Sequence, residues 1–286
     1  MTMRQPPASA FVTDLPVLLP VRAATEPAPQ VRLWHGAVLC AVVLLCAGIA
    51  HAGASPAARA GVIAILIKWT PLLFRGFLFN VLISMMAMAL GTALGTVLGL
   101  MLISLRRPVR SGSWFITQFF RNAPWLVLLF FAMYMLPFRI AIGPVVIPLP
   151  DWFKAVIGFS LPVMANVAEI VRGAVGSIPS GQWEAAESLA FSRRQQIWSI
   201  ILPQCVKRML PPWMNLYAIL TMATVLASIV GVNEVMTLAG QVSAAEGGRT
   251  DLLTPLYGYI LIWFFLYSYP IARLTTRLER KFAVKI

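Results

Sequence analysis

Charged residues are scarce in this sequence of 286 amino acids: Asp, Glu, Lys and Arg together make up 12% of it, whereas 59% is hydrophobic. The mean hydropathy is +0.80. A chain with so few charges cannot cover an apolar core of this size with polar side chains in water, and several apolar runs are long enough to cross a bilayer. The composition excludes a soluble domain and predicts an all-α integral membrane protein.

Histidine and cysteine are also rare, with two His and three Cys in the whole chain. Cys40 and Cys46 lie in one apolar run, Cys205 lies alone, and neither a CxxC pair nor an HExxH segment occurs. These residues provide no disulfide framework and no set of metal ligands. We therefore expect that the chain binds no metal and no cofactor.

Acidic residues number only 10 against 23 Lys and Arg, which gives a formal net charge of +13. The basic residues flank apolar runs and do not alternate with aromatic residues, so the charge indicates membrane topology rather than nucleic-acid binding. Basic clusters follow the second span, the polar segment near residue 190 and the last span. The positive-inside rule then predicts about six spans with both termini in the cytoplasm.

The apolar runs divide the chain into three parts. Residues 1–33 are predicted to be a disordered cytoplasmic tail, residues 34–75 an extra N-terminal helix with an extracytoplasmic connector, and residues 76–282 a core of five helices. The expected spans are Trp34–Ala50, Gly76–Leu105, Trp114–Pro137, Trp152–Gly176, a fifth that begins at Pro211 and reaches Gly231, and Leu253–Ala272. A loop at 138–151 and a helix and loop at 232–252 are expected outside.

Three glycines recur at four-residue spacing in the second expected span, at Gly91, Gly95 and Gly99. Small residues on one stripe of a membrane helix allow another helix to approach closely. We favour packing within the chain over an interface between subunits.

The third expected span contains an arginine, Arg121, about two turns inside the apolar run. An unpaired cation at such a depth costs about 3 kcal/mol, so this side chain should face protein or water, unless it reaches the headgroups at the cytoplasmic surface. Pro124 cannot donate to residue 120, which predicts a kink or a new helix start there. In the fourth span, Glu169 and Arg172 are three residues apart on one helical face and are expected to pair, either as a simple anchor or as part of a gate.

A polar segment, Ser177–Gln204, separates the fourth and fifth expected spans. It is predicted to form two short helices: Ser180 would cap the first, with Glu184 near its positive end, and Ser192 with Gln195 would form a capping box on the second. The connector would be Ala190-Phe191, where a non-glycine residue in a left-handed turn carries a strain of about 1 kcal/mol. Such a segment is either a solvated connection or a surface that docks into another protein, with Trp183 and Phe191 exposed.

The spacing within this segment resembles the cytoplasmic EAA loop of ABC importer permeases: Glu184-Ala185-Ala186, Ala190 four residues on, then Ile200-x-Leu202-Pro203. The family usually has Gly where this chain has Ala190. The resemblance implies a coupling helix that inserts into a groove of a separate ATPase subunit. The coupling residues that it implies are Gly181, Glu184, Ala185, Ala186, Ala190 and Phe191.

Two further stretches resemble polar amino-acid permeases. FFRNAPWL is similar to the family's F-R-G-T-P-L-L, and MANVAEIVRG is similar to A-Y-x-A-E-x-x-R-G, with Asn166 in place of Tyr. Alignment on Asn215 and Gly231 puts Met222 and Ala223 where the family often has Lys and Asp, and retains Thr224. The residues thereby implied to line a translocation path or gate are Arg121, Asn122, Pro124, Glu169, Arg172, Asn215 and Thr224.

The core as a whole resembles the five-helix, MetI-like core of the histidine/glutamine/glutamate-type permeases of binding-protein-dependent amino-acid transport. The resemblance implies a bacterial inner-membrane importer subunit that works with ATP-binding cassette subunits, a periplasmic solute-binding protein, a second permease subunit of the same or a related chain, and membrane lipid. The sequence has no GxxxxGK[ST] segment, so ATP and Mg²⁺ should bind the partner ATPase and this chain should not be an enzyme.

Three alternatives stay open at this point. The chain could import a different small polar solute, or it could be a non-transporting scaffold, since Met222 and Ala223 lack the family's charged pair. A membrane-embedded enzyme or ion-coupled transporter would need buried acids, and Glu169 is the only acid expected inside a span.

Overall fold

The computed structural model describes residues 41, 56–142 and 145–282. The chain divides into two compact units, Met1–Leu39 and Cys40–Ile286. The first unit lies wholly outside the described residues. The expected tail and the expected first span, Trp34–Ala50, also fall outside them, apart from the helical residue Ala41.

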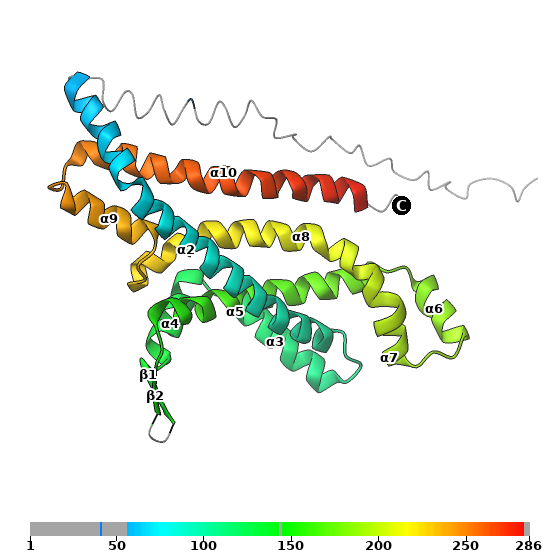
Figure 1. Ribbon diagram of the computed structural model, residues 1–286. Coiled ribbons are helices and arrows are strands. Elements are labelled where there is room, and N and C mark those ends of the chain that lie inside the picture. The colour runs from blue at the N-terminus through cyan, green and yellow to red at the C-terminus, as the bar shows by residue number, and fades with distance from the viewer. Residues whose placement is uncertain (1–40, 42–55, 143–144, 283–286) are drawn as a thin grey trace, which may run out of the picture. The chain divides into compact units, whose positions relative to one another are not determined.

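The described part of the second unit is built from long apolar helices (Figure 1). Four helical stretches are long and apolar enough to cross a membrane: they contain α2 (Pro56–Leu102), α5 (Asp151–Gly176), α8 (Leu202–Ala223) and α10 (Thr250–Phe282). A fifth candidate is the pair α3 (Arg107–Asn122) and α4 (Trp125–Met135), which is apolar enough only when the two are taken together and is bent by 106° at the break between them. The five elements agree with the predicted five-helix core, and the new helix start after Pro124 is confirmed.

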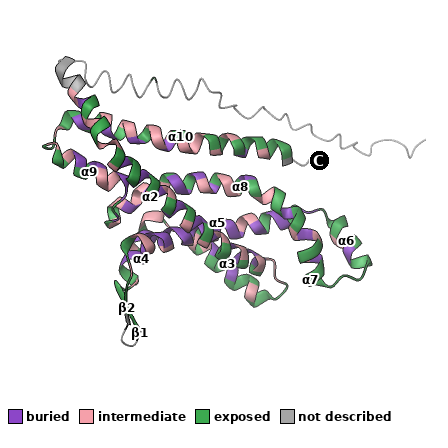
Figure 2. Ribbon diagram, in the orientation of Figure 1, coloured by how far each residue is buried: buried purple, intermediate pink, exposed green. Residues whose placement is uncertain are grey.

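Helix α5 lies at the centre of this arrangement. In its most apolar stretch 72% of the residues are buried, against 22% for α10, and Figure 2 shows the buried residues concentrated along α5. Its neighbours are α2, α3, α4 and α8. A helix that is apolar on all sides is stable only inside a bundle, whereas the exposed apolar surface of α10 fits contact with lipid.

The glycine stripe on α2 lies directly against α5. A Cβ atom on Gly91 would come within 2.4 Å of Val163, and one on Gly99 within 2.6 Å of Val171. A Cβ on Gly95 would meet the carbonyl oxygen of Met164 at 2.5 Å. The glycines therefore serve packing within the chain, as we favoured, because any side chain there would push the two backbones apart.

Three expected helix starts are wrong. The third span does not start at Trp114, because α3 begins seven residues earlier at Arg107. Helix α2 begins at Pro56 and runs through Pro71, so residues 56–75 are helical and are not a connector. The fifth span begins before Pro211: the π-helix η1 (Gln196–Ile201) continues into α8, which contains Pro211 and Pro212. A proline removes one backbone bond but does not end a membrane helix whose surroundings favour its continuation. This helix ends as the 3₁₀ segment η2 (Thr224–Val230) at Gly231, whose φ is +88°.

The segments expected outside the membrane contain two small elements. The loop at 138–151 holds a hairpin of two antiparallel strands, β1 (Arg139–Ile142) and β2 (Val145–Pro148), with Ile140 opposite Ile147. The all-α prediction therefore holds for the spanning part and misses this hairpin. Helix α9 (Val235–Ala245) follows η2, as expected for 232–252, and Glu234 caps its first turn.

Candidate functional site

Within the spans, one carboxylate lies between two arginines. The Glu169 carboxylate of α5 lies 2.7 Å from the Arg172 guanidinium, and its other oxygen is 3.9 Å from that of Arg121. Gln118 donates a hydrogen bond of 3.2 Å to the same oxygen that faces Arg121. The predicted pair of Glu169 and Arg172 is confirmed, and its carboxylate is only 12% exposed.

The break at Pro124 determines where Arg121 points. Helix α3 ends at Asn122, Pro124 is the N-cap of α4, and Arg121 lies in the last turn of α3. A cation is favoured there because the carbonyl end of a helix carries partial negative charge. The Arg121 side chain is 46% exposed and reaches Glu169, so it faces both protein and solvent-accessible space.

These residues line a pocket of about 620 Å³ between α3, α5 and α8. Four of the predicted residues meet in it, Arg121, Glu169, Arg172 and Asn215. Sequence reasoning missed three further polar members, Asn166, Ser177 and Arg208. The Arg208 guanidinium donates to the carbonyl oxygen and the hydroxyl of Ser177, at 2.6 and 2.9 Å.

Chemically, this polar pocket combines three guanidinium groups, one carboxylate and two side-chain amides. It can accept a carboxylate at the arginines and an ammonium group at Glu169, with amide groups for further hydrogen bonds. Among the described residues, no group of three or more His, Cys, Asp or Glu is placed to hold a metal ion.

The remaining residues predicted for the path lie elsewhere. The amide of Asn122 turns back to the carbonyl oxygen of Gln118 at 2.7 Å, and Pro124 shapes the helix break. Thr224 is fully buried and accepts a hydrogen bond of 3.1 Å from Asn80. The structure therefore does not bring Asn122, Pro124 or Thr224 into the polar pocket.

Thr224 belongs instead to a buried network that joins α2, η2 and α9. The Asn80 amide donates to Glu234 at 2.7 Å, and the Glu234 carboxylate also accepts from the backbone N–H groups of Met236 and Thr237. Burial raises the pKa of Glu234 above its ordinary value, although these hydrogen bonds oppose the shift. The sequence carries no local signal for this contact between distant segments.

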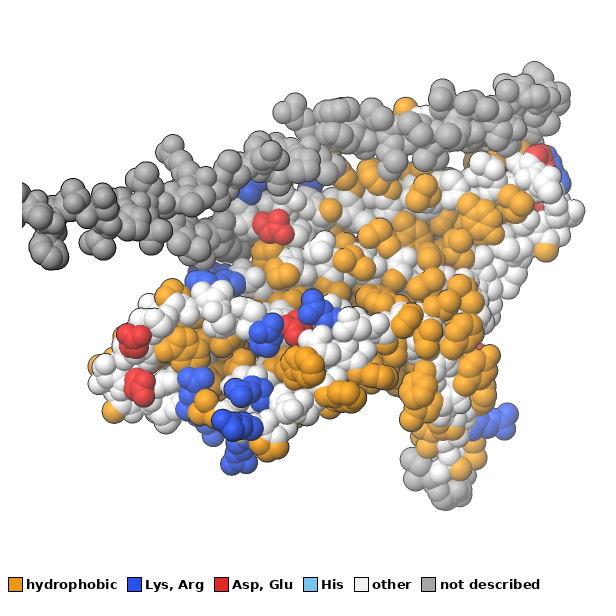
Figure 3. All heavy atoms as spheres, turned by 180° about the vertical axis from the view of Figure 1, so that it is seen from behind, with side chains coloured by type: hydrophobic (Ala, Val, Ile, Leu, Met, Phe, Trp, Pro, Cys, Tyr) orange, Lys and Arg blue, Asp and Glu red, His pale blue; other side chains and the backbone are white. Residues whose placement is uncertain are grey.

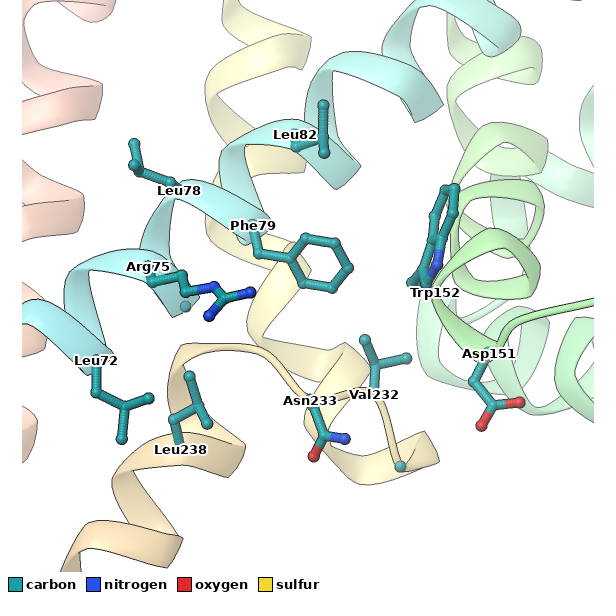
Figure 4. Close-up of a pocket in the computed structure, with 12 residues that line it drawn as sticks. Leu72, Arg75, Leu78, Phe79, Leu82, Asp151, Trp152, Val232, Asn233 and Leu238 are labelled. Carbon is teal, nitrogen blue, oxygen red and sulfur yellow. The ribbon is translucent and has the colours of Figure 1, made fainter.

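A second pocket, of about 660 Å³, lies at the N-terminal end of α5, between α2 and the segment that leads into α9 (Figure 4). Arg75 and Phe79 line it from α2, and Trp152 faces them from α5. The rings of Phe79 and Trp152 meet edge to face at 6.3 Å. Asp151 begins α5, whereas Glu169 lies eighteen residues later, about 27 Å along the helix axis. The two pockets are therefore near opposite ends of α5.

The predicted pair of short helices is present between α5 and α8 as α6 (Ser180–Ser188) and α7 (Arg193–Gln195). Ala190 has a φ of +55°, and the capping box of Ser192 and Gln195 is formed, so both predictions are confirmed. Ser180 is not the cap: Pro179 holds that position, and Ser180 is the first helical residue. Glu184 consequently lies in the middle of α6, beyond the first turn.

Figure 1 shows that α6 and α7 project at one end of the described bundle. Of the six residues predicted for coupling, Gly181, Glu184, Ala185, Ala190 and Phe191 are exposed, and Ala186 is buried. Trp183 is not the exposed aromatic we expected: it packs against the cluster of Ile201 and Cys205, under the guanidinium of Arg193 at 4.2 Å. The exposed apolar tip is formed by Leu189 and Phe191.

Comparison with known proteins finds relatives that are named as permease proteins. The "Probable amino-acid ABC transporter permease protein YckA" of Bacillus subtilis is 34% identical over 74% of this chain and 90% of its own length. The "L-cystine transport system permease protein TcyB" of the same organism is 32% identical over 61% of this chain and 72% of its own length.

Among solved structures, "Crystal structure of an amino acid ABC transporter with histidines" matches with a TM-score of 0.65 at 22% identity, over 76% of this chain and 96% of that chain. At this identity the likeness concerns the fold alone. The sequence model of the binding-protein-dependent transport system inner membrane components matches residues 91–283. The chain thus belongs to the family of binding-protein-dependent transport system inner membrane components.

Proposed function

We propose that this chain is the membrane-spanning permease subunit of an ATP-driven importer of polar amino acids. The observation that carries the proposal is the polar pocket in which Glu169 lies between Arg121 and Arg172. An α-amino acid bears a carboxylate and an ammonium group, and this pocket offers groups that complement both. The names of the relatives, an amino-acid permease and an L-cystine permease, support the same class of substrate.

The α6–α7 segment would couple the permease to a separate ATPase that binds ATP and Mg²⁺. Its projection from the bundle, the exposed Glu184 and the apolar tip of Leu189 and Phe191 suit insertion into a groove of another protein. The left-handed Ala190 holds the turn between the two helices at a fixed angle. The end of the bundle that carries α6 and α7 would then face the cytoplasm, with both termini on that side.

At the opposite end, α9 and the hairpin β1–β2 would receive a periplasmic solute-binding protein. A second permease subunit, either a copy of this chain or a related one, would complete the path. Exposed large apolar residues on α8 and η2 support such a partner or lipid contact, among them Ile219, Met222 and Ile229.

The test is ATP hydrolysis by the complex of this chain with its ATPase and binding protein in proteoliposomes, measured against a panel of amino acids. We expect that a subset of polar amino acids stimulates hydrolysis several-fold and that omission of the binding protein abolishes the stimulation. An intact complex that responds to no amino acid but responds to another small polar solute would reassign the substrate. A complex that responds to neither would favour a scaffold role.

A further inference from the structure

The search of the described residues leads to a basic pocket that the proposed transport function does not use. It has a volume of about 400 Å³ and lies between the C-terminal end of α2, the turn before α3, and the α7–η1 segment. Three arginines line it, Arg106, Arg193 and Arg194, together with apolar side chains that include Leu105 and Trp198. We refer to it as the arginine pocket.

The charge in the arginine pocket is uncompensated. No Asp or Glu lines it, and within residues 56–142 and 145–282 the structure shows no ion pair for Arg106 or Arg194. Arg193 is held over the Trp183 ring, which leaves its positive charge in place. Like charges brought together repel each other, so a bound anion would stabilise this arrangement. Guanidinium groups are the side chains best suited to bind phosphate oxygens.

Large apolar side chains lie exposed at the rim of the arginine pocket. Leu105 is 73% exposed and Trp198 is 58% exposed, although both are large apolar side chains. Figure 3 shows Lys and Arg side chains gathered beside hydrophobic ones at the end of the bundle that carries α6 and α7. The pocket lies where the apolar run of α2 ends, so the topology expected from the sequence puts it near the headgroups.

We propose that the arginine pocket binds an anionic phospholipid of the leaflet on the α6–α7 side, which is the cytoplasmic leaflet in the proposed orientation. The lipid phosphate lies between Arg106 and Arg194, and an acyl chain runs along Leu105 and Trp198. A lipid is the occupant that supplies both the phosphate and the apolar chain; free phosphate would leave Leu105 and Trp198 uncovered. Basic pockets between membrane helices bind anionic headgroups in this way.

The first test is lipid retention measured by native mass spectrometry on the full-length chain, with equimolar phosphatidylglycerol and phosphatidylethanolamine. We expect the anionic lipid to be retained preferentially. The double variant Arg106→Gln with Arg194→Gln should lower that retention about 25-fold, since each arginine beside the lipid headgroup contributes about fivefold. The matched control removes the same charge elsewhere: Arg277→Gln with Arg280→Gln, both exposed on α10 and outside the pocket, should lower retention far less.

Several results would overturn the assignment. The proposal is wrong if the control variant loses as much lipid as the pocket variant, or if both lipids are retained equally. Displacement of the lipid by inorganic phosphate at the same concentration would assign the pocket to free phosphate. Loss of the lipid when the ATPase binds would assign the pocket to the ATPase. The double variant Arg106→Lys with Arg194→Lys, which keeps the charge, guards against misfolding and should retain most of the binding.

A second measurement does not depend on removing the arginines. Phosphatidylglycerol with brominated acyl chains should quench the fluorescence of Trp198, and the quenched signal should fall in Trp198→Phe. Equal quenching in the wild type and in Trp198→Phe would place the chains elsewhere and contradict the proposal. Both tests are made without transport, so their failure would leave the importer proposal untouched.

Discussion

The side-chain amide of Asn80 donates a hydrogen bond of 2.7 Å to the carboxylate of Glu234, which lies 154 residues further along the chain. The Asn80 carbonyl oxygen also accepts from the backbone N–H of Val235 at 3.1 Å. Both side chains are fully buried, so a lost partner would leave a polar group unsatisfied at a cost of about 1–3 kcal/mol. This contact fixes the start of α9 on α2.

The raised pKa of Glu234 predicts how stability varies with pH. A carboxyl group whose pKa is higher in the folded state binds its proton more tightly when the protein is folded. Its contribution to folding stability is therefore fully present below the ordinary pKa of 4.5 and is lost as the pH rises through the folded pKa. Glu234→Gln should therefore flatten the fall in the unfolding midpoint over that range, while lowering stability overall. The unfolding midpoint is measured in detergent at a series of pH values. The same fall in midpoint with pH in Glu234→Gln and in the wild type would contradict the prediction.

Gly95→Ala should destabilise the fold, because its new Cβ would meet the Met164 carbonyl oxygen at 2.5 Å and the backbones would have to separate. Overpacking of this kind costs about 1–3 kcal/mol. Gly112→Ala is the matched control, since no atom lies within 4 Å of its Cβ position on α3. The thermal unfolding midpoint of Gly95→Ala should be lower than that of Gly112→Ala. Equal midpoints would show that α2 and α5 are not held at this distance.

Glu184→Lys should uncouple transport from ATP hydrolysis, because it reverses the charge of an exposed side chain in the middle of the projecting α6. We expect uptake to fall at least tenfold, a loss of about 1.4 kcal/mol in coupling, with weaker co-purification of the ATPase. Glu279→Lys makes the same change at an exposed position on α10 and should behave as the wild type. Normal uptake and normal co-purification of Glu184→Lys would remove Glu184 from the interface.

Arg121→Ala should reduce uptake by about tenfold or more while the complex still assembles, because the polar pocket loses a cation 3.9 Å from Glu169. Arg121→Lys keeps the positive charge but lacks the planar guanidinium group, so its uptake should lie between that of the wild type and that of Arg121→Ala. Arg277→Ala, on the exposed face of α10, is the control. If Arg121 only reaches the headgroups, uptake by Arg121→Ala will be close to normal.

Local chemistry was readable from the sequence. The capping box of Ser192 and Gln195, the left-handed Ala190 and the break at Pro124 each depend on a few adjacent residues, and the structure has all three. The pair of Glu169 and Arg172 was also predictable, since residues three apart face the same side of a helix.

Contacts between distant segments were not readable. Thr224 was assigned to the path by resemblance, but its hydroxyl faces Asn80 on another helix, and nothing near either residue signals that. Arg208 enters the polar pocket only because α8 crosses the end of α5, where Ser177 accepts its hydrogen bonds. The expected start at Pro211 depends on local sequence alone, whereas packing along the whole helix decides whether it continues, as α2 does through Pro71 and α8 does through Pro211.

The length of α2 has a mechanical consequence. Between Gly76, which packs against Val235 at the start of α9, and Leu102, beside the arginine pocket, no proline interrupts the helix, and this stretch is about 39 Å long. The glycines that pack against α5 lie along the same stretch, and the helix can tilt about this contact. A tilt of about 5° about Gly95 moves Gly76, about 28 Å away, by about 2.5 Å and moves Leu102, about 10 Å away on the other side, by about 1 Å. A push on α9 would therefore arrive beside the coupling segment reduced to less than half its size and opposite in direction.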